Sequence, residues 1–299
     1  MVDPLTPTPR VTVITPAHNA SATLAEAVGS ALAQTVSDLE VIVVDDGSAE
    51  PAAHVLRELN DPRLRVIRTA ANRGVSAARN TAVATARAPV LAQLDADDLW
   101  RPDHLEGLLP ALSDPAVGLA YSNAEIIGTP LLDRAISVRR PGDGLPEWVS
   151  ERAFHPVDDL VRLYRVNPIP SPAAIMRTRA VRAVGAYPRW LTVGEDYYLY
   201  IKLRRAGWHF AYVDRMSAVY RWPERGRGVS FDTRRSARQT LKLFVVLTVR
   251  SPGTRELWAR LLAEIANLIE THVPGSVPVG RRLKRLRGGT RSGRRGRTA

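Results

Sequence analysis

The sequence predicts an α/β fold in which a mostly parallel sheet is flanked by helices. Two observations predict this class: short β-branched segments alternate with helical segments, and acidic clusters directly follow two of the strand-like segments. Val11–Thr15 and Glu40–Val44 have the pattern of buried strands, and an apolar helical stripe that begins at Leu24 lies between them. Strand, helix and strand within about 35 residues form a βαβ unit, so these strands should be parallel.

The same alternation continues along the chain. It predicts helices at 52–59, 76–86, 179–184 and 195–205, and strands at 64–68, 90–94, 117–122, 173–176 and 208–213. Residues 128–170 are rich in Pro, Gly, Asp and Arg, which predicts a long excursion from the sheet. Near the end, one helical stripe consists of Leu257, Leu261, Ile265, Leu268 and Ile269. It is predicted to pack on the body of the protein, and the basic tail that follows leaves a membrane-surface role as the alternative.

Composition excludes several classes of protein. The chain has 299 residues, of which 45% are hydrophobic and 24% charged, as in an ordinary soluble globular protein. It has no cysteine, which excludes a disulfide framework, thiolate metal sites and a cysteine nucleophile. No apolar run approaches the roughly 20 residues that span a bilayer, and the first residues lack the apolar core of a signal peptide.

The formal charge of +12 is concentrated at one end of the chain. Residues 281–297 hold nine Arg or Lys and no acid, so residues 281–299 are expected to form a basic disordered tail. Such a tail can adhere to an anionic membrane surface, bind nucleic acid without specificity, or remain a solvated terminus without a partner. The sequence leaves these three alternatives open and indicates no specific nucleic-acid partner.

The segment LDADD at 94–98 carries the strongest chemical signal. Two carboxylates one residue apart at a strand end can both face a hard cation, which leaves coordination positions free for phosphate oxygens. The structural alternative is a polar loop in which Asp98 caps a helix that begins near Pro102. A calcium-binding loop fits poorly because the Gly at position six and the Glu at position twelve are missing.

Two further acidic segments have both a structural and a functional interpretation. DDGS at 45–48 is good turn chemistry, although an Asp at a strand end can also accept from a base or a ribose hydroxyl. Glu195 and Asp196 begin an amphipathic helix, where the helix dipole favours acids. One of them could instead be a general base that faces an acceptor.

In order and spacing, these segments resemble the family 2 glycosyltransferases of the GT-A fold. The resemblance runs from about Val11 to about Ser230, through VTVITPAHN, VIVVDDGS, NRGVSAARN, LDADD and GEDYYLYIKL. It implies a GT-A-type, Rossmann-like nucleotide-binding sheet, a nucleotide-diphosphate sugar donor, which is most often UDP-linked, and inversion at the anomeric carbon. It also implies Mg²⁺ or Mn²⁺ as the cofactor.

The resemblance also implies roles for individual residues. The nucleotide pocket would be lined by Thr15, Pro16, Ala17 and Asn19, with Asp46 on the base. The donor phosphates and sugar would lie near Asn72, Arg73, Gly74 and Arg79, with Asp95 on the ribose or the sugar. Asp97 would bind the metal beside Asp98, and Asp196 would be the catalytic base in the Glu195-Asp196 pair. An aspartate with an ordinary pKa near 4 would already be ionised at neutral pH. Trp190 is a weak candidate for stacking on the acceptor.

The sequence departs from the family pattern near residue 221. Many members have a metal-assisting His after the last core Arg, whereas this chain reads YRWPERGRGVS at 220–230 and has none. The Gln-x-x-Arg-Trp motif of processive synthases is also absent, because Ala218 stands where the Gln would be. We therefore expect transfer of a single sugar rather than synthesis of a chain.

These observations give one division of the chain and one favoured function. We expect a nucleotide-sugar-binding half at 1–125, an acceptor and catalytic-base half at 126–232, C-terminal helices at 233–280 and the tail. The expected function is transfer to a hydroxyl of a glycan, a lipid-linked glycan or a small molecule in cell-surface polysaccharide biosynthesis. The expected location is cytoplasmic, with peripheral contact at the inner face of the membrane as an option.

Two rival functions are weaker. The first is a non-catalytic scaffolding protein that binds nucleotide sugars, and the intact LDADD and Glu195-Asp196 count against it. The second is a nucleotidyltransferase that makes sugar nucleotides. It would need a Gly-rich basic loop after the first strand, and PAHNASA at 16–22 has no such loop.

Overall fold

A computed structural model of the chain describes residues 8–127, 159–165, 167–221 and 233–272. The chain divides into two compact units, residues 1–228 and 229–299. Most of the excursion predicted at 128–170 and the whole basic tail at 281–299 lie outside the described residues. The finer division of the chain predicted from the sequence stays a prediction.

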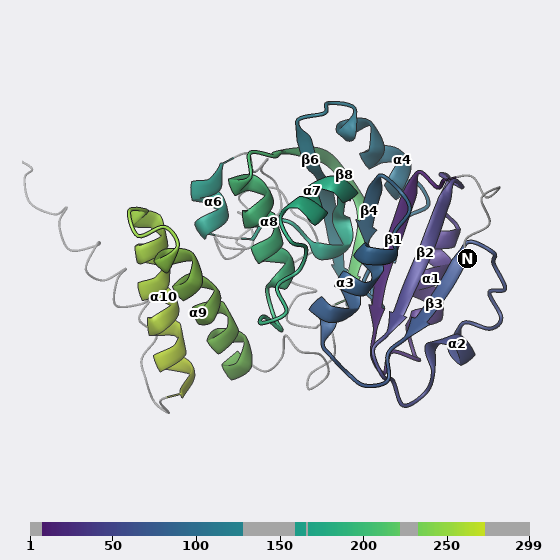
Figure 1. The fold of residues 1–299 in the computed structure, drawn as a ribbon, viewed down its shortest axis with the longest axis horizontal. Helices are drawn as coiled ribbons and strands as arrows, with labels where there is room; N and C mark the ends of the chain where they lie inside the picture. Colours follow the sequence, from purple (N-terminus) through teal and green to yellow (C-terminus); the bar gives the residue numbers. More distant parts are fainter. Residues whose placement is uncertain (1–7, 128–158, 166, 222–232, 273–299) are drawn as a thin grey trace, which may run out of the picture. The chain divides into compact units, whose positions relative to one another are not determined.

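The first unit alternates strands and helices, as the sequence predicts (Figure 1). Its strands are β1 (Val11–Ala17), β2 (Leu39–Asp45), β3 (Leu64–Arg68), β4 (Val90–Gln93), β5 (Leu99–Trp100), β6 (Val117–Ile127), β7 (Ala174–Arg177) and β8 (His209–Arg221). Its helices are α1 (Leu24–Leu32), α2 (Ala52–Val55), α3 (Val75–Thr85), α4 (His104–Leu108), α6 (Leu160–Arg165), α7 (Thr178–Ala183) and α8 (Glu195–Arg205).

One sheet joins all of these strands in the order β3-β2-β1-β4-β7-β6-β8-β5. Strands β3, β2, β1 and β4 are parallel neighbours, and β6 is parallel to β8. Strand β7 is antiparallel to both β4 and β6, and the short β5 is antiparallel to β8. The predicted mostly parallel sheet is therefore confirmed, and β5 and β7 are the strands that run against it.

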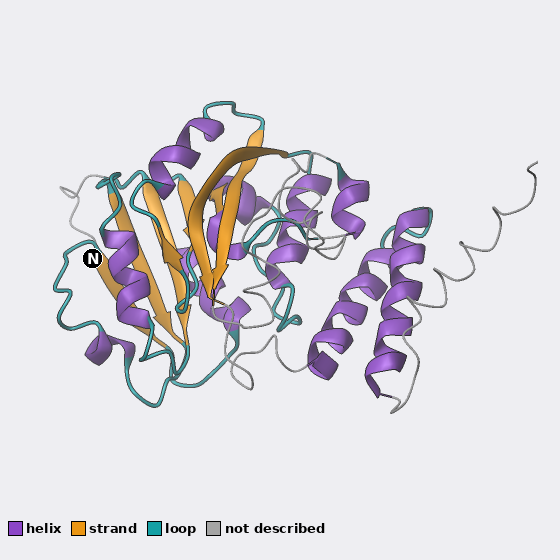
Figure 2. Ribbon diagram, turned by 180° about the vertical axis from the view of Figure 1, so that it is seen from behind, coloured by secondary structure: helices purple, strands orange, loops and turns teal. Residues whose placement is uncertain are grey.

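Helices cover both faces of the parallel part of the sheet. Helix α3 lies in front of β1 and β2 in Figure 1, whereas α1 lies in front of the same strands in Figure 2, which is seen from behind. Strands β1, β2 and β4 are accordingly almost entirely buried. This explains their continuous apolar pattern, because a parallel strand covered on both faces has no polar side.

Strands β6 and β8 extend several residues beyond the strands predicted at 117–122 and 208–213. Polar side chains occupy the interior of both and interrupt the apolar pattern. Ser122 Oγ lies 2.6 Å from Ser217 Oγ, and Ser217 Oγ lies 2.8 Å from Nδ1 of the buried His104. Burial lowers the pKa of His104 to about 3, so this histidine is a neutral structural group.

In the second unit the structure describes two helices, α9 (Thr233–Val249) and α10 (Arg255–His272). The single packed stripe predicted for this region is wrong. Leu257 and Leu261 are buried, whereas Ile265 and Ile269 are 40% and 55% exposed. The reason is that α10 packs on α9 along one face, and the two isoleucines lie on a neighbouring face of the helix.

Gly47 determines how closely two loops approach at the carboxyl end of β2. Its φ is +72°, and a Cβ at this position would lie 2.8 Å from the backbone of both Ala71 and Asn72. Neither contact can be relieved by a rotation of a side chain, because both involve backbone atoms. The turn after β2 therefore requires glycine twice, once for its φ and once for space.

We predict that Gly47→Ala lowers the free energy of unfolding by about 1–3 kcal/mol, the range for a strained backbone conformation. Equilibrium urea denaturation measures this change. Gly29→Ala is the matched control, because Gly29 lies inside α1 with open space where the Cβ would be. It should be neutral or stabilising by up to about 1 kcal/mol. Equal losses in both variants would contradict the proposed constraint.

Candidate functional site

The acidic clusters meet at one edge of the sheet. Strands β2 and β4 flank β1 and run parallel to it, so their carboxyl ends lie at the same edge. Asp46 follows β2, and Asp95, Asp97 and Asp98 follow β4. Ligands of open α/β sheets bind outside this edge, which makes it the candidate site.

Asp45 is a structural residue of the first cluster. It is fully buried; its Oδ1 accepts from Ser48 N at 2.9 Å and its Oδ2 accepts from Ala52 N at 3.0 Å. Arg68 Nη1 also donates to Oδ2 at 2.9 Å. Burial by itself raises the pKa of Asp45, but these donors outweigh it and lower the pKa. Asp45 therefore shapes the turn after β2.

Asp46 holds the segment between β3 and α3. Its two oxygens accept from Arg73 N at 3.0 and 2.9 Å, and Oδ2 accepts from Gly74 N at 2.7 Å. Thr69 Oγ1 donates to Oδ1 at 3.0 Å. A carboxylate offers about four acceptor positions, and these contacts use all of them. The first function of Asp46 in this structure is thus to fix residues 72–74.

The residues predicted to line the nucleotide pocket are the last three of β1, Thr15, Pro16 and Ala17, and Asn19 in the loop that follows. Thr15 is buried, and its Oγ1 has no hydrogen-bond partner in the described part of the chain. Ala17 pairs with Asp45 in the sheet register, with Pro16 before it. Asn19 has a φ of 52°, receives a hydrogen bond from Ala49 N at 2.9 Å, and donates its own N–H to Ser48. These bonds attach the β1 loop to the β2 loop.

Arg79 connects the acids that follow β4 to the Glu195-Asp196 pair at the start of α8. Its side chain is buried in α3; Nη2 donates to Asp95 Oδ1 at 2.5 Å, and Nη1 donates to Glu195 Oε1. Its guanidinium carbon also lies 5.4 Å from the centre of the Tyr187 ring. Burial alone lowers the pKa of Arg79, but the Asp95 and Glu195 carboxylates raise it well above its usual value. Arg79 is therefore permanently charged.

By contrast, the nearby Asn72 and Arg73 are exposed. Both residues precede Gly74 in the chain, and Gly74 directly precedes α3. Asp46 accepts from the backbone N–H of Arg73 and of Gly74, and Asn72 Oδ1 accepts from Gly74 N at 3.0 Å, so both side chains hold the turn before α3.

Asp97 and Asp98 form a carboxylate pair with different surroundings. Asp97 is exposed, whereas Asp98 is 1% exposed and its Oδ1 accepts from Arg221 N at 2.8 Å. Asp98 Oδ2 is buried and has no hydrogen-bond partner within the described ranges. Although its side chain is exposed, the surrounding protein partly desolvates the Asp97 carboxylate. This desolvation and the nearby Asp95 carboxylate raise the pKa of Asp97 to about 6. Burial and both neighbouring carboxylates raise the pKa of Asp98 well above its usual range.

These carboxylates fit a divalent cation. An unpaired buried oxygen and mutual repulsion are both costs that a cation beside Asp97 and Asp98 would remove. Among the residues the structure describes, no three His, Asp or Glu side chains are grouped so that they could hold a metal by themselves. A cation here would therefore need further ligands, as one that is shared with a diphosphate has.

Glu195 and Asp196 open helix α8, directly after Gly194 in a left-handed conformation. Glu195 is buried against Arg79, and Asp196 Oδ1 accepts from Tyr197 N at 2.6 Å. Burial and the Glu195 carboxylate raise the pKa of Asp196 to about 7. The expectation of an ordinary pKa near 4 for this residue is therefore wrong, because the helix start is desolvated and carries two adjacent acids.

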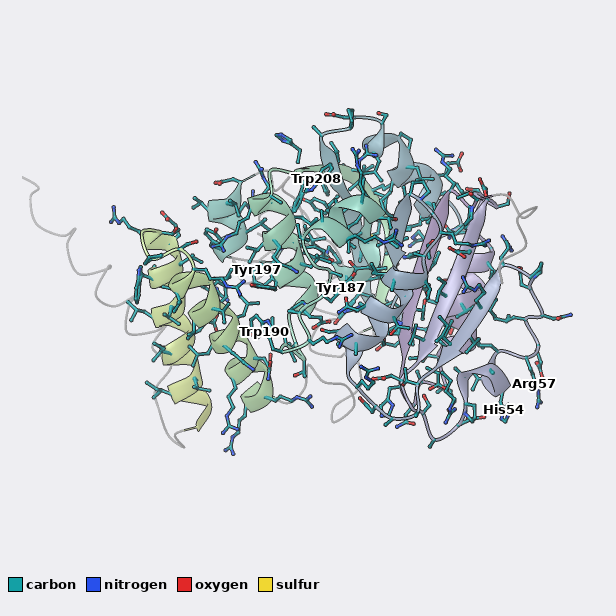
Figure 3. All side chains as sticks on the ribbon, viewed as in Figure 1. His54, Arg57, Tyr187, Trp190, Tyr197 and Trp208 are labelled. Carbon is teal, nitrogen blue, oxygen red and sulfur yellow. The ribbon has the colours of Figure 1, made fainter. Side chains whose placement is uncertain are left out.

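Trp190 and Tyr187, which Figure 3 labels, and Arg221 complete the neighbourhood. Trp190 packs edge-on against Tyr198 with ring centres 5.2 Å apart, so stacking on an acceptor stays a prediction. Tyr187 and Arg221 were not predicted as site residues. No local motif indicates Tyr187, and the backbone contact from Arg221 to Asp98 could not be found from side-chain identity.

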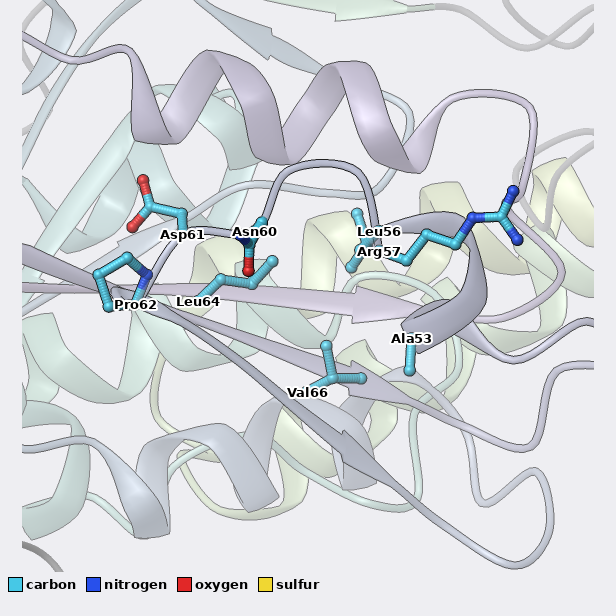
Figure 4. A pocket seen from close by; sticks show the side chains of 8 residues that line it. All are labelled: Ala53, Leu56, Arg57, Asn60, Asp61, Pro62, Leu64 and Val66. Atoms are coloured by element: carbon cyan, nitrogen blue, oxygen red, sulfur yellow. The ribbon is translucent and has the colours of Figure 1, made fainter.

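Two surface pockets lie away from these carboxylates. One, of about 350 Å³, lies between α2 and the edge strand β3, as Figure 4 shows. The other, of about 1030 Å³, is lined by residues before β4 and after β7, at the opposite edge of the sheet. Neither pocket contains a residue of the acidic clusters, so we do not place the chemistry in either of them.

Solved structures resemble the chain over most of its length. The structure of Staphylococcus aureus TarS 1–349 has a TM-score of 0.63 and 18% sequence identity, and the match covers 93% of this chain and 79% of that one. The mannosyltransferase PcManGT from Pyrobaculum calidifontis, in complex with GDP-Man and Mn²⁺, has a TM-score of 0.61 and 21% identity. That match covers 95% of this chain and 81% of that one. These likenesses establish a glycosyltransferase GT-A fold.

Curated relatives match a shorter part of the chain. The succinoglycan biosynthesis protein ExoO of Rhizobium meliloti is 37% identical over 119 residues, which are 40% of this chain and 34% of that protein. The UDP-Glc:alpha-D-GlcNAc-diphosphoundecaprenol beta-1,3-glucosyltransferase WfgD of Escherichia coli is 32% identical over 117 residues, or 39% and 46% of the two chains. The chain thus spans less than half the length of these relatives.

The family assignment rests on a longer match. The sequence model described as Glycosyl transferase family 2 matches residues 12–185, which is more than half of the chain. This range contains β1, the β2 turn, Arg79 and the carboxylates after β4, and it ends ten residues before Glu195. The chain therefore belongs to the family 2 glycosyltransferases and is an enzyme of that family.

Proposed function

We propose that this enzyme transfers a single sugar from a nucleotide-diphosphate sugar to a hydroxyl acceptor, with metal assistance and inversion of the anomeric carbon. The observation that carries the proposal is the ionic bridge from Asp95 through Arg79 to Glu195. It joins the turn after β4, which also carries Asp97 and Asp98, to the start of α8, which also carries the candidate base Asp196. A donor side and an acceptor side thus share one edge of the sheet.

For the donor, we propose that the nucleotide lies along the β1 end, against Thr15, Pro16, Ala17 and Asn19. A UDP-linked sugar is favoured, because the donor named for the relative WfgD is UDP-Glc. Asp46 serves this site by holding residues 72–74. Contact between Asp46 and the base, which the family resemblance implies, would require one of its present hydrogen bonds to break.

For the metal, we propose Asp97 and Asp98 as ligands of Mg²⁺ or Mn²⁺, with Asp95 directed at the ribose or the donor sugar. The raised pKa values of both ligands and the unpaired Asp98 Oδ2 support this assignment. When bound, the cation supplies charge neutralisation for the diphosphate that leaves. The protein's own contribution is to hold these oxygens in place, with Asp98 fixed by Arg221 N.

For the chemical step, we propose Asp196 as the general base. The acceptor oxygen forms a bond to the anomeric carbon while the bond from that carbon to the diphosphate oxygen breaks. Asp196 takes the hydroxyl proton, and the nucleoside diphosphate leaves with the electron pair. A pKa near 7 suits this role, because a base works best near the operating pH. Glu195 is held by Arg79 and positions Asp196 rather than reacting.

A second candidate function is a non-catalytic protein of the same fold that binds nucleotide sugars. The carboxylate pair Asp97 and Asp98 and the raised pKa of Asp196 argue against it. We further propose a glycan, lipid-linked glycan or small-molecule acceptor, in the polysaccharide biosynthesis that relatives such as ExoO are named for. The proposed location is the cytoplasm, at or near the inner face of the membrane. No described helix is long and apolar enough to cross a bilayer.

We predict that Asp97→Asn abolishes the Mn²⁺-dependent part of nucleotide binding. Calorimetric titration of UDP, dTDP and GDP, each with and without Mn²⁺, measures this binding and also identifies the nucleobase of the donor. Asp38→Asn is the matched control, because this exposed Asp precedes β2 at the opposite edge of the sheet. Full Mn²⁺ dependence in the Asp97 variant would remove the metal assignment.

We predict that Asp196→Asn keeps donor binding but lowers kcat/KM by about 100-fold or more, as expected for loss of a general base. In the natural enzyme Asp196 must be ionised to act as a base, so kcat/KM should rise with pH through about 7. Initial rates of nucleoside diphosphate release across pH 5–9 (about two units on either side of the pKa) measure both effects. Full activity of the variant would exclude Asp196 as the base.

The same pKa has a consequence for stability. The pKa of Asp196 is higher in the folded protein than in the unfolded chain. Between these two pKa values the folded protein therefore holds a proton on Asp196 that the unfolded chain has lost. The stability that comes from this proton is lost as pH rises through about 7. Asp196→Asn should therefore melt at a higher temperature than the natural protein at pH 8, with a smaller difference at pH 5. The opposite order would contradict the raised pKa.

We predict that Arg79→Met lowers the free energy of unfolding by about 3–5 kcal/mol, because it leaves two desolvated carboxylates without a counter-charge. Urea denaturation measures this loss. Arg57→Met is the control, because Arg57 is exposed and its ion pair with Glu58 is long, at 3.8 Å. It should change the stability by no more than about 0.5 kcal/mol. A comparable effect of both substitutions would show that the bridge does not stabilise the fold.

A further inference from the structure

The net charge of the chain belongs entirely to the second unit. Residues 1–228 hold 26 Lys or Arg and 26 Asp or Glu, so the catalytic unit is formally neutral. Residues 229–299 hold 16 basic and 4 acidic residues, which accounts for the whole +12. The excess is not confined to the tail, because α9 alone carries Arg234, Arg235, Arg238 and Lys242 and no acid.

One face of α10 accounts for the packing of the two helices. Leu257 and Leu261 are buried, together with Leu243, Phe244 and Leu247 of α9. Arg260 lies 5.2 Å from the centre of the Phe244 ring and pairs with the buried Glu264. This face of α10 therefore packs on α9.

A second apolar stripe on α10 stays exposed. It consists of Trp258, Leu262, Ile265 and Ile269, which are 48%, 64%, 40% and 55% exposed. Their spacing of four, three and four residues places them in one row along the helix. The acids Glu256 and Glu264 fall on other sides of the helix. On α9, Val245 and Val249 are also exposed, at 42% and 74%.

Trp258 is prepared for an apolar environment. Its indole Nε1 donates to Pro252 O at 2.8 Å, so its one polar group is satisfied within the unit. The rest of the ring is hydrocarbon and can leave water without breaking a hydrogen bond. Tryptophans with this combination are enriched where one side of a residue is apolar and the other is wet.

We infer that the stripe Trp258, Leu262, Ile265 and Ile269 is a docking face that lies on an anionic lipid surface. A helix with an exposed apolar row and a strongly basic setting lies in the plane of the headgroups, where both features are favoured. Anionic lipid attracts nearby Lys and Arg, and burial of the row holds the helix there. The 18-residue helix α10 is not apolar enough to span the bilayer, which is consistent with an orientation parallel to its surface.

Charge decides between lipid and a second copy of the chain as the occupant. Two copies that met along this stripe would bring two units of formal charge +12 together, and like charges oppose such an association. An anionic surface complements the same unit. The inference does not depend on the donor chemistry proposed above, because it concerns residues outside the catalytic unit.

The test is co-sedimentation of the full-length protein with vesicles of phosphatidylcholine alone and of phosphatidylcholine with phosphatidylglycerol. We expect binding to the mixed vesicles, and at least about tenfold weaker binding of the double variant Leu262→Ser, Ile269→Ser. The matched control is Ala259→Ser, Ala263→Ser, which adds two hydroxyls at exposed positions of the same helix outside the stripe. Circular dichroism establishes that both variants fold.

Three results would overturn the inference. The stripe variant could bind mixed vesicles as tightly as the control variant does. The natural protein could bind neutral and anionic vesicles equally, which would remove the electrostatic part. Light scattering after size-exclusion chromatography could show a dimer that the stripe variant alone dissociates, which would identify a second copy as the occupant. None of these readouts uses transfer activity, so failure here is distinguishable from failure of the proposed reaction.

Discussion

The buried guanidinium of Arg79 is the interaction on which the site depends. It comes from α3, and its partners come from the turn after β4 and the start of α8. A charge removed from water is tolerable only when it is fully paired, so the three elements must arrive together. Because Glu195 is 116 residues away along the chain, this pairing also ties the start of α8, with the proposed base Asp196, to the sheet.

Around this bridge the backbone and the carboxylates have divided functions. Asp45 and Asp46 accept hydrogen bonds from neighbouring backbone N–H groups and stabilise the loops. Asp97, Asp98 and Asp196 keep theirs partly unused and have raised pKa values. Acids of identical chemistry therefore differ in what they can do. The difference depends on how many hydrogen-bond donors of the protein contact each carboxylate. This division distinguishes the carboxylates that hold the structure from those available to a ligand.

The sequence predicted the parallel core and the edge at which the acids gather, because buried parallel strands and turn residues have local signatures. It could not predict that Arg79 faces two carboxylates instead of a phosphate, since that depends on Glu195 arriving from far along the chain. It also missed the length of β6 and β8, whose interior Ser122 and Ser217 satisfy each other only after the strands pair. The pKa of Asp196 likewise depends on burial, which no local pattern contains.

The neutrality of the catalytic unit bears on how the enzyme meets its substrates. With 26 positive and 26 negative side chains, residues 1–228 have no net charge with which to attract a donor from a distance. Capture of a nucleotide sugar then depends on contacts made within the site, and its rate should respond weakly to ionic strength. Salt would change where the molecule resides in a cell extract much more than how fast it reacts.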